Sequence, residues 1–365
     1  MPSNSLGQEF TITLFGESHG KCVGIVVDGC PAGLELSESD VQFELDKRVP
    51  RKAGLASSRI EEDKVEILSG IFQGRTTGAP LAMLVSNKDV DSSPYERLKD
   101  IPRPGHADYS AQIRYGGFSD YRGGGRFSGR MTAAMVMAGA IAKKLLAKVG
   151  VEVLAHTLSI GDIASEKNST REELQTVVYA SPVRCNDPEK TILMEKAILQ
   201  AAENGDSLGG VVKAVAYGVP SGVGEPFFNS LDAELAKALF CIPAVKGVEF
   251  GSGFNSARMK GSENNDPITV KSGRGEFETN NAGGILGGLS TGQEIVMQVA
   301  FKPTPSIRKR QKSANLVSMR DTEFELTGRH DPCIVPKAVP VVEAITSIVL
   351  VDFVIRSGII AKILK

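Results

Sequence analysis

Two of the four histidines lie in short, glycine-containing loops that suit acid–base chemistry. His19 lies between Gly16 and Gly20, directly after an alternating apolar segment, and glycines allow a backbone to approach a ligand closely. His106 follows Arg103 in a loop that a proline and a glycine restrict. Because histidine exchanges protons near neutral pH, either side chain is a candidate acid or base, although each loop alone is equally compatible with a surface turn.

Other chemical interpretations of the histidine segments are weaker. The pair Gly20-Lys21 resembles the end of a P-loop, but Cys22 replaces the required Ser or Thr and a strand follows instead of a helix. His156 lies inside a strand-like run, so we expect it to be structural rather than catalytic. No histidine is spaced from another His or a Cys like a metal ligand, so the sequence predicts no metal site.

The strongest functional cluster covers residues 121–130, where three arginines and four glycines directly precede an apolar segment. Glycine N–H groups, a helix N-terminus and arginine side chains all bind anions. A flexible RNA-binding segment is the main alternative, but this cluster is short and leads into a predicted helix. The cluster therefore predicts an anion site.

Three later segments add weaker signals, each of which alone is typical of a turn or a solvated loop. Residues 280–288 offer bare backbone for a flat ring, and residues 302–306 combine a cation, hydroxyls and a rigid turn. Residues 328–332 place Arg, His and Asp together. With the histidine loops they predict an enzyme for a phosphorylated, polyanionic small molecule. No G-x-G-x-x-G with a downstream acid is present, which disfavours a Rossmann nucleotide site.

Sequence patterns typical of strands and of helices are interspersed along the whole chain, and the predicted elements would position these loops. Alternating apolar residues predict strands, and apolar residues at helical spacing with suitable caps predict helices. The predicted strands are 10–15, 23–28, 151–159, 210–217 and 294–301, and the predicted helices are 37–47, 131–148, 195–204, 232–240 and 337–355. Residues 86–106 are predicted to form a long surface loop. Without a linker or repeat, we expect one α/β domain over residues 1–365.

The amino-acid composition indicates which classes of binding partner and which cell compartment to expect. A net charge of −1 gives no electrostatic footprint for nucleic acid or an anionic membrane. Five scattered cysteines without CxxC spacing, and an opening that lacks a signal-peptide pattern, lead us to expect a cytoplasmic protein with reduced thiols. The apolar stretches near 131–142 and 338–351 are shorter than the roughly 20 residues of a membrane span, so buried helices are expected.

Taken together, the motifs closely resemble the chorismate synthase family over nearly the whole chain. The matching segments are 15–20, 28–33, 103–108, 121–130, 205–210, 246–251, 283–288, 302–306 and 328–332. The resemblance implies an α/β (α+β) fold, a β-α-β sandwich with a central helical layer, usually as a homotetramer. It also implies a carbon–oxygen lyase of the shikimate pathway that converts 5-enolpyruvylshikimate 3-phosphate to chorismate by anti-1,4-elimination of phosphate. Reduced FMN is required without net redox change, and some members reduce it with NADPH.

The resemblance also implies roles for individual residues. His19, with Ser18 beside it, matches the proton donor to the departing phosphate, and His106 matches the histidine that protonates reduced flavin. Asp331 matches the carboxylate that helps to remove the C6 proton, with Ser128 assisting. The residues that match FMN contacts are Arg126, Phe127, Ser128, Pro243, Ala244, Gly287, Lys302, Pro303, Thr304, Pro305, Ser306 and Arg329. Those that match contacts to substrate or NADP phosphate are Arg48 and Arg130.

The chain departs from the common family pattern at three positions near these sites. Phe127 and Met131 replace a hydroxyl and a carboxylate that many members carry, and Gly54 stands where relatives often have Arg. Two alternatives remain at this point: a flavin-dependent oxidoreductase that uses the same pocket, and a non-enzymatic anion or nucleic-acid binder built on the 121–130 cluster. The net charge argues against the second. The source of flavin reduction and the number of subunits stay open.

Overall fold

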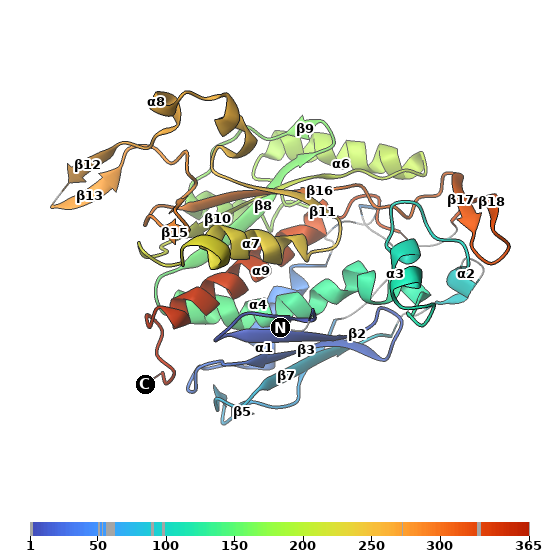
Figure 1. The fold of residues 1–365 in the computed structure, drawn as a ribbon, viewed down its shortest axis with the longest axis horizontal. Coiled ribbons are helices and arrows are strands. Elements are labelled where there is room, and N and C mark those ends of the chain that lie inside the picture. The colour runs from blue at the N-terminus through green and yellow to red at the C-terminus, as the bar shows by residue number, and fades with distance from the viewer. Residues whose placement is uncertain are drawn as a thin grey trace.

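Two antiparallel sheets enclose a layer of helices in the computed structural model, which describes residues 3–49, 52, 54–55, 63–88, 91–96, 99–271, 273–326 and 330–364 (Figure 1). The first sheet has the strand order β1-β2-β3-β7-β4. Its strands are β1 (Ser5–Leu6), β2 (Thr11–Gly16), β3 (Cys22–Asp28), β7 (Leu81–Ser86) and β4 (Val65–Ile67). The end of β2 and the end of β7 lead into loops that carry candidate site residues.

The second sheet has the strand order β11-β16-β10-β8-β9. Its strands are β11 (Val245–Phe250), β16 (Ile295–Phe301), β10 (Gly210–Tyr217), β8 (Glu152–Ile160) and β9 (Ile163–Ala164). In β16 the side chains of Ile295, Met297, Val299 and Phe301 are buried while the residues between them are partly exposed. Because side chains alternate across a strand, this pattern gives the sheet one face that packs in the core.

The middle layer consists mainly of α4 (Thr132–Ala147) and α9 (Val335–Arg356), which pack against each other. Helix α4 contacts strands of both sheets, and α9 contacts the second sheet. Both helices are buried on nearly all sides, as expected for helices that are apolar all round. They approach closely, since a Cβ added at Gly139 would lie 2.3 Å from the Ala344 Cβ. Among the described residues, α9 alone is long and apolar enough to cross a membrane, but its apolar window is wholly buried in the protein.

Four further helices flank these layers. Helix α1 (Glu38–Asp46) packs on α4 and β4, and α7 (Leu231–Phe240) packs on α9 and β11. Helix α1 begins after Ser37 as predicted, and the Ser37 N–H donates a 2.9 Å hydrogen bond to the Asp40 carboxylate. Helices α5 (Arg171–Val177) and α6 (Pro188–Glu203) contact β8. Helix α6 begins earlier than predicted because the Asp187 side chain caps it and Pro188 suits its first turn.

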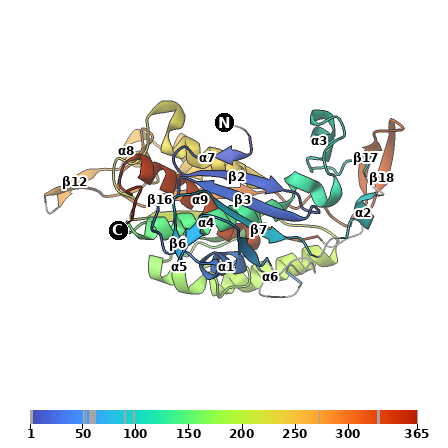
Figure 2. The ribbon, with the colours of Figure 1, turned by 90° about the horizontal axis from the view of Figure 1, so that it is seen from below.

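Smaller elements project at opposite ends of the molecule, as Figure 2 shows. One end carries α3 (Asp108–Arg114) and the hairpin of β17 (Gln311–Asn315) with β18 (Arg320–Phe324), and the other carries the hairpin of β12 (Ile268–Lys271) with β13 (Arg274–Phe277). The remaining short strands and α-helices are β5 (Ile71–Phe72), β6 (Arg75–Thr76), α2 (Ser93–Glu96), β14 (Ile285–Leu286), β15 (Leu289–Ser290) and α8 (Gly261–Asn264), and, within the described residues, four 3₁₀ helices lie at Arg122–Phe127, Gly129–Met131, Phe227–Asn229 and Gly253–Arg258.

The expected fold class, a β-α-β sandwich with a central helical layer, is confirmed. All five predicted strands and all five predicted helices correspond to elements of the structure. Strands β7 and β11 and the β17–β18 hairpin were not predicted, and the long loop at 86–106 contains the short helix α2. All five cysteines are free thiols. The expectation of one domain over 1–365 stays a prediction.

Candidate active site

Three consecutive glycines form the centre of the candidate site. Gly123, Gly124 and Gly125 have φ values of 58°, 82° and 51°, in the left-handed region that favours glycine. This glycine loop lies within a 3₁₀ turn at Arg122–Phe127, just before α4. The Ser18 N–H donates a 3.2 Å hydrogen bond to the Gly125 carbonyl, which ties the loop after β2 to the glycine loop.

His19 packs directly against the first of these glycines. A Cβ added at Gly123 would lie 2.3 Å from the His19 ring, so only glycine allows this approach. The His19 Nδ1 lies 2.9 Å from the Ser92 Oγ, and the ring meets Tyr95 edge to face at a centroid distance of 5.4 Å. Residues of the 86–106 loop therefore fix the orientation of the imidazole.

His106 packs against the next glycine. A Cβ added at Gly124 would lie 3.1 Å from the His106 Nε2. On the other side of the ring, Nδ1 lies 2.6 Å from an Asp108 carboxylate oxygen, which also accepts a hydrogen bond from Arg103. Burial alone raises the pKa of the Asp108 carboxyl, but hydrogen bonds from Arg103 and His106 outweigh burial and hold that pKa well below its usual range. Asp108 is thus an ionised anchor for His106.

The structure brings the two predicted histidine loops and the arginine–glycine cluster into one site. His19 and His106 contact neighbouring glycines of the same loop. The Ser128 hydroxyl donates a 3.1 Å hydrogen bond to the Ser18 hydroxyl, so these two predicted residues also meet. Proton donors and acceptors from three separate segments therefore converge around bare backbone.

The segment 302–306 borders the His106 loop. The Lys302 ammonium donates a 2.7 Å hydrogen bond to the Gly105 carbonyl, and Arg103 donates one of 3.2 Å to the Ser306 hydroxyl. The Lys302 N–H bonds to the Ala244 carbonyl, which brings the Pro243-Ala244 pair to the same place. Partial burial, helped by a neighbouring lysine, lowers the pKa of Lys302. The 302–306 segment and the Pro243-Ala244 pair therefore lie beside the His106 loop.

A cavity of about 300 Å³ opens beside the glycine loop and the Arg103–Asp108 pair. Its walls combine aromatic side chains with charged groups and bare backbone, a mixture that suits a flat, polar ligand. Those walls include Tyr95, Tyr121, Phe127, Arg103, Asp108 and Gly124. In the 302–306 segment, which borders the His106 loop, the Thr304 hydroxyl oxygen is buried and has no hydrogen-bond partner among the described residues.

Arg48 and Arg130 both bind the carboxylate of Asp63, a residue that was not predicted from the sequence. Asp63 accepts a 2.6 Å hydrogen bond from Arg48 on one oxygen and pairs with Arg130 through the other. Arg48 also donates to the Thr132 hydroxyl at 3.1 Å, while its buried Nε has no partner among the described residues. Burial lowers the pKa of Arg48, and Asp63 opposes that effect.

Asn87 connects this arginine pair to the His19 loop and was also not singled out. Its side-chain oxygen accepts a 2.9 Å hydrogen bond from the Arg130 Nε. Its amide nitrogen donates to the carbonyls of Glu17 and Gly20, at 3.0 and 2.9 Å. A lone Asp or Asn outside a motif gives no signal in a single sequence, so only the folded chain identifies them.

The predicted C-terminal site residues are only partly placed. Asp331 forms a 2.7 Å ion pair with Lys337 near the start of α9, and its charge contributes to the environment of Arg48. Arg329 lies outside the described residues. Arg126 reaches the Asn4 side chain at 2.8 Å, and Phe127 is 40% exposed.

Gly287 is not brought to the histidines within one chain. It occupies the turn between β14 and β15, with no atom near the position of a Cβ. The adjacent Gly288 carbonyl accepts from the N–H of Leu231, the first residue of α7, whereas Pro243 follows the other end of that helix. Ten helical residues span about 15 Å, which separates Gly287 from the Pro243-Ala244 pair.

A larger cavity of about 730 Å³ lies elsewhere, among α1, α4, α5 and β8. Its buried charges are paired with one another: Lys143 bonds to Glu44 and Glu343 at 2.7 and 2.6 Å, and the Tyr179 hydroxyl donates to Glu343 at 3.0 Å. Burial and the nearby carboxylates raise the pKa of Tyr179 well above its usual value. These groups satisfy one another, so the cavity gives no specific sign of a ligand.

Comparison with known proteins identifies the family. A family model described as chorismate synthase matches residues 10–355. Proteins named chorismate synthase are 52% identical in Korarchaeum cryptofilum, over 98% of this chain and 99% of the relative, and 52% identical in Dehalococcoides mccartyi, over 100% of both. A solved structure titled "Crystal Structure of Chorismate Synthase" superposes with a TM-score of 0.77 at 32% identity, covering 96% of this chain and 93% of that chain. This chain belongs to the chorismate synthase family.

Proposed function

We propose that the protein eliminates phosphate from 5-enolpyruvylshikimate 3-phosphate to form chorismate, as a carbon–oxygen lyase of the shikimate pathway in the cytoplasm. The observation that carries the proposal is the placement of His19 and His106 on adjacent glycines of one loop. Family membership and full-length similarity to proteins named chorismate synthase support the same conclusion.

His19 and the arginine pair serve the departing phosphate in this proposal. The His19 imidazole donates a proton to the leaving group, with its ring held by Ser92 and Tyr95. Arg48 and Arg130 offset the negative charge that develops on the phosphate as the C–O bond breaks. The Nε of Arg48, which is buried without a partner among the described residues, supports a role in binding an anion.

His106 lies on the other side of the glycine loop and is proposed to transfer a proton there. The ionised Asp108 carboxylate lies 2.6 Å from its Nδ1 and fixes the ring, while Nε2 faces Gly124. Arg103 anchors the same carboxylate and reaches Ser306. Asp331 is proposed to accept the proton that leaves C6, with its position set by the ion pair to Lys337.

The residues of the site fit reduced FMN, which we propose as the cofactor. The 300 Å³ cavity has aromatic walls and bare backbone at Gly124, and the hydroxyl of Thr304 is buried without a partner among the described residues. Lys302, Thr304 and Ser306 would hold the cofactor from one side, and Ser128 with the glycine loop from the other. When bound, reduced FMN would supply electron density to the reaction. NADPH is a candidate source of the reducing equivalents.

We also propose a homotetramer. The separation of Gly287 from the Pro243-Ala244 pair in one chain supports a site to which a second subunit contributes. Sedimentation equilibrium should then give a mass near four times 38.8 kDa. A monomer with full activity would contradict this part of the proposal.

Stoichiometry tests the proposed reaction against a flavin-dependent oxidoreductase. With the purified protein, reduced FMN and enolpyruvylshikimate phosphate in the absence of oxygen, many phosphate ions should be released for each flavin while the flavin stays reduced. Release of one product molecule for each flavin oxidised would identify a redox reaction and would overturn the proposal.

A further inference from the structure

We infer that Asp63 is a positioning residue for the two arginines of the site, and that Gln42 fixes Asp63 from α1. The inference rests on the proposed function for its reaction, but its geometry stands on the contacts of these side chains alone. Asp63 is 7% exposed and has a φ of 43°, in the left-handed region that a non-glycine residue rarely adopts. A residue held in this way needs surrounding contacts that stabilise it.

The Asp63 carboxylate lies between two guanidinium groups. One oxygen accepts from Arg48 and the other from Arg130, so the single carboxylate holds both side chains at once. Two partly buried guanidinium groups repel each other without a shared anion. The three groups together leave one positive charge in excess, which is suited to a phosphorylated substrate.

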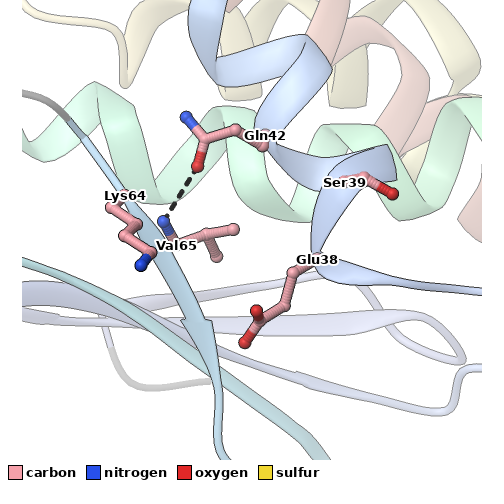
Figure 3. Close-up of a pocket in the computed structure, with 5 residues that line it drawn as sticks. All are labelled: Glu38, Ser39, Gln42, Lys64 and Val65. Carbon is pink, nitrogen blue, oxygen red and sulfur yellow. Dashed lines mark hydrogen bonds between the residues drawn. The ribbon is translucent and has the colours of Figure 1, made fainter.

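The Gln42 side chain forms hydrogen bonds with the backbone of both neighbours of Lys64, and Figure 3 shows the bond to Val65. The Val65 N–H donates a 3.1 Å hydrogen bond to the Gln42 side-chain oxygen. The Gln42 amide nitrogen donates to the Asp63 carbonyl at 3.3 Å. One side chain of α1 therefore defines the backbone position from which the Asp63 carboxylate reaches the arginines.

The same unit extends to the His19 loop. Arg130 bonds to Asn87, and Asn87 holds the carbonyls of Glu17 and Gly20 on either side of His19. A shift of Asp63 would thus change both the arginine pair and the support of the proposed proton donor. We expect substrate binding to suffer first, because Asp63 touches the arginines directly.

Glu38 provides a matched control, one helical turn before Gln42. Its carboxylate accepts a 3.2 Å hydrogen bond from the Ile67 N–H, so it also docks α1 onto β4. In the part of the chain that the structure describes, Glu38 forms no hydrogen bond or ion pair with Asp63 or either arginine, and Figure 3 shows it on the same side of α1 as Gln42. If only the contact between α1 and β4 matters, Glu38→Ala and Gln42→Ala should change KM by similar amounts. If Gln42 positions the arginines through Asp63, only Gln42→Ala should raise KM.

The experiment compares steady-state kinetics and thermal midpoints of four variants with the wild type. Asp63→Asn should raise KM for the phosphorylated substrate at least about tenfold, with a smaller fall in kcat, since a charge-assisted contact is weakened. Gln42→Ala should raise KM by roughly threefold or more, and Gln42→Glu, which keeps an acceptor for Val65 but loses the donor to Asp63, should do the same. Glu38→Ala should leave KM within about twofold of wild type. An unchanged KM in folded Asp63→Asn, or an equal rise in Glu38→Ala, would overturn the inference.

A binding measurement separates this inference from the proposed reaction. If the wild type releases no phosphate from the substrate, the proposed function fails, and isothermal titration with inorganic phosphate then tests the positioning of the arginines. Phosphate affinity should be weaker in Asp63→Asn and Gln42→Ala than in wild type and Glu38→Ala. Equal phosphate affinity in all four proteins would refute the inference whether or not the enzyme turns over.

Discussion

At the scale of single residues, each site histidine is held by a different kind of partner. His106 lies against the ionised Asp108 carboxylate, whereas His19 contacts the neutral hydroxyl of Ser92 and the ring of Tyr95. A carboxylate stabilises an imidazolium, and a hydroxyl mainly fixes the direction of the ring. Different neighbouring groups therefore hold the two imidazole rings in place.

Replacement of His19 tests its role as proton donor. His19→Ala should lose at least about tenfold in kcat, because general acid catalysis is typically worth roughly 10²–10⁴-fold. The ring is half-buried in a loop outside the core, so the thermal midpoint and the affinity for FMN should stay close to wild type. Anaerobic kinetics and a melting curve measure these quantities. Full activity in this variant would remove His19 from the mechanism.

Ser92 and Ser93 form a matched pair that tests how His19 is oriented. Ser92→Ala removes the 2.9 Å contact to Nδ1 and should lower kcat by roughly two- to tenfold, since a neutral hydrogen bond is worth about 0.5–1.5 kcal/mol. The exposed Ser93 hydroxyl bonds only to Asp91 in the hydrogen bonds described, so Ser93→Ala should leave kcat unchanged. Equal kcat values for the two variants would show that Ser92 does not orient the imidazole.

At the scale of elements, loops at strand ends carry the proposed site residues, and helices hold these loops in place. The loop after β2 carries Ser18 and His19, the loop after β7 carries Asn87, and the glycine loop leads into α4. Helix α4 packs on β3 and β7 of the same sheet, so these loops share one rigid support. Arg48 lies just beyond the C-terminal end of α1. Within α1, Gln42 forms a hydrogen bond with the backbone of the segment before β4.

His156 in β8 makes stability depend on pH. Burial, and then the nearby Lys213, lower the pKa of this imidazole from 6.5 to about 4 in the folded state. Between these two values the unfolded chain binds a proton that the folded chain does not, so stability falls as pH drops below 6.5 and stops falling below about 4. At pH 5 the loss is about 2 kcal/mol.

His156→Phe should remove this part of the pH dependence. Urea unfolding at pH 7.5 and at pH 5 should show that the wild type loses about 2 kcal/mol more than the variant between the two conditions. Turnover at neutral pH should stay close to wild type if the variant folds, because His156 makes no contact with the glycine loop in the structure. The same loss of stability in both proteins, or an inactive but folded variant, would contradict this account.

Local periodicity was enough to predict the elements with strong patterns, but not the contacts between distant segments. The apolar stretches of α4 and α9 and the alternation in β2 and β16 give clear signals. Strand β7 is apolar from Leu81 to Val85 without an alternating polar residue, and β17 is polar, so neither stands out. Asp63 and Asn87 act only because folding places them beside arginines from other elements, and such pairings leave no mark in one sequence.

At the scale of the whole molecule, charge is concentrated locally rather than spread over the surface. The chain has a net charge of −1, yet Arg48, Arg103, Arg130 and Lys302 lie around the glycine loop or on the network that supports it. A local cluster of positive charge of this kind attracts a polyanionic small molecule. The predicted anion site and the family therefore agree with the overall composition.

The most direct test of the central claim is the dependence of product formation on the oxidation state of FMN. In an anaerobic assay with purified protein and enolpyruvylshikimate phosphate, chorismate and phosphate should appear in equal amounts when FMN is chemically reduced. Neither product should form with oxidised FMN or without flavin. Equal turnover under all three conditions, or release of phosphate without chorismate, would contradict the proposed function.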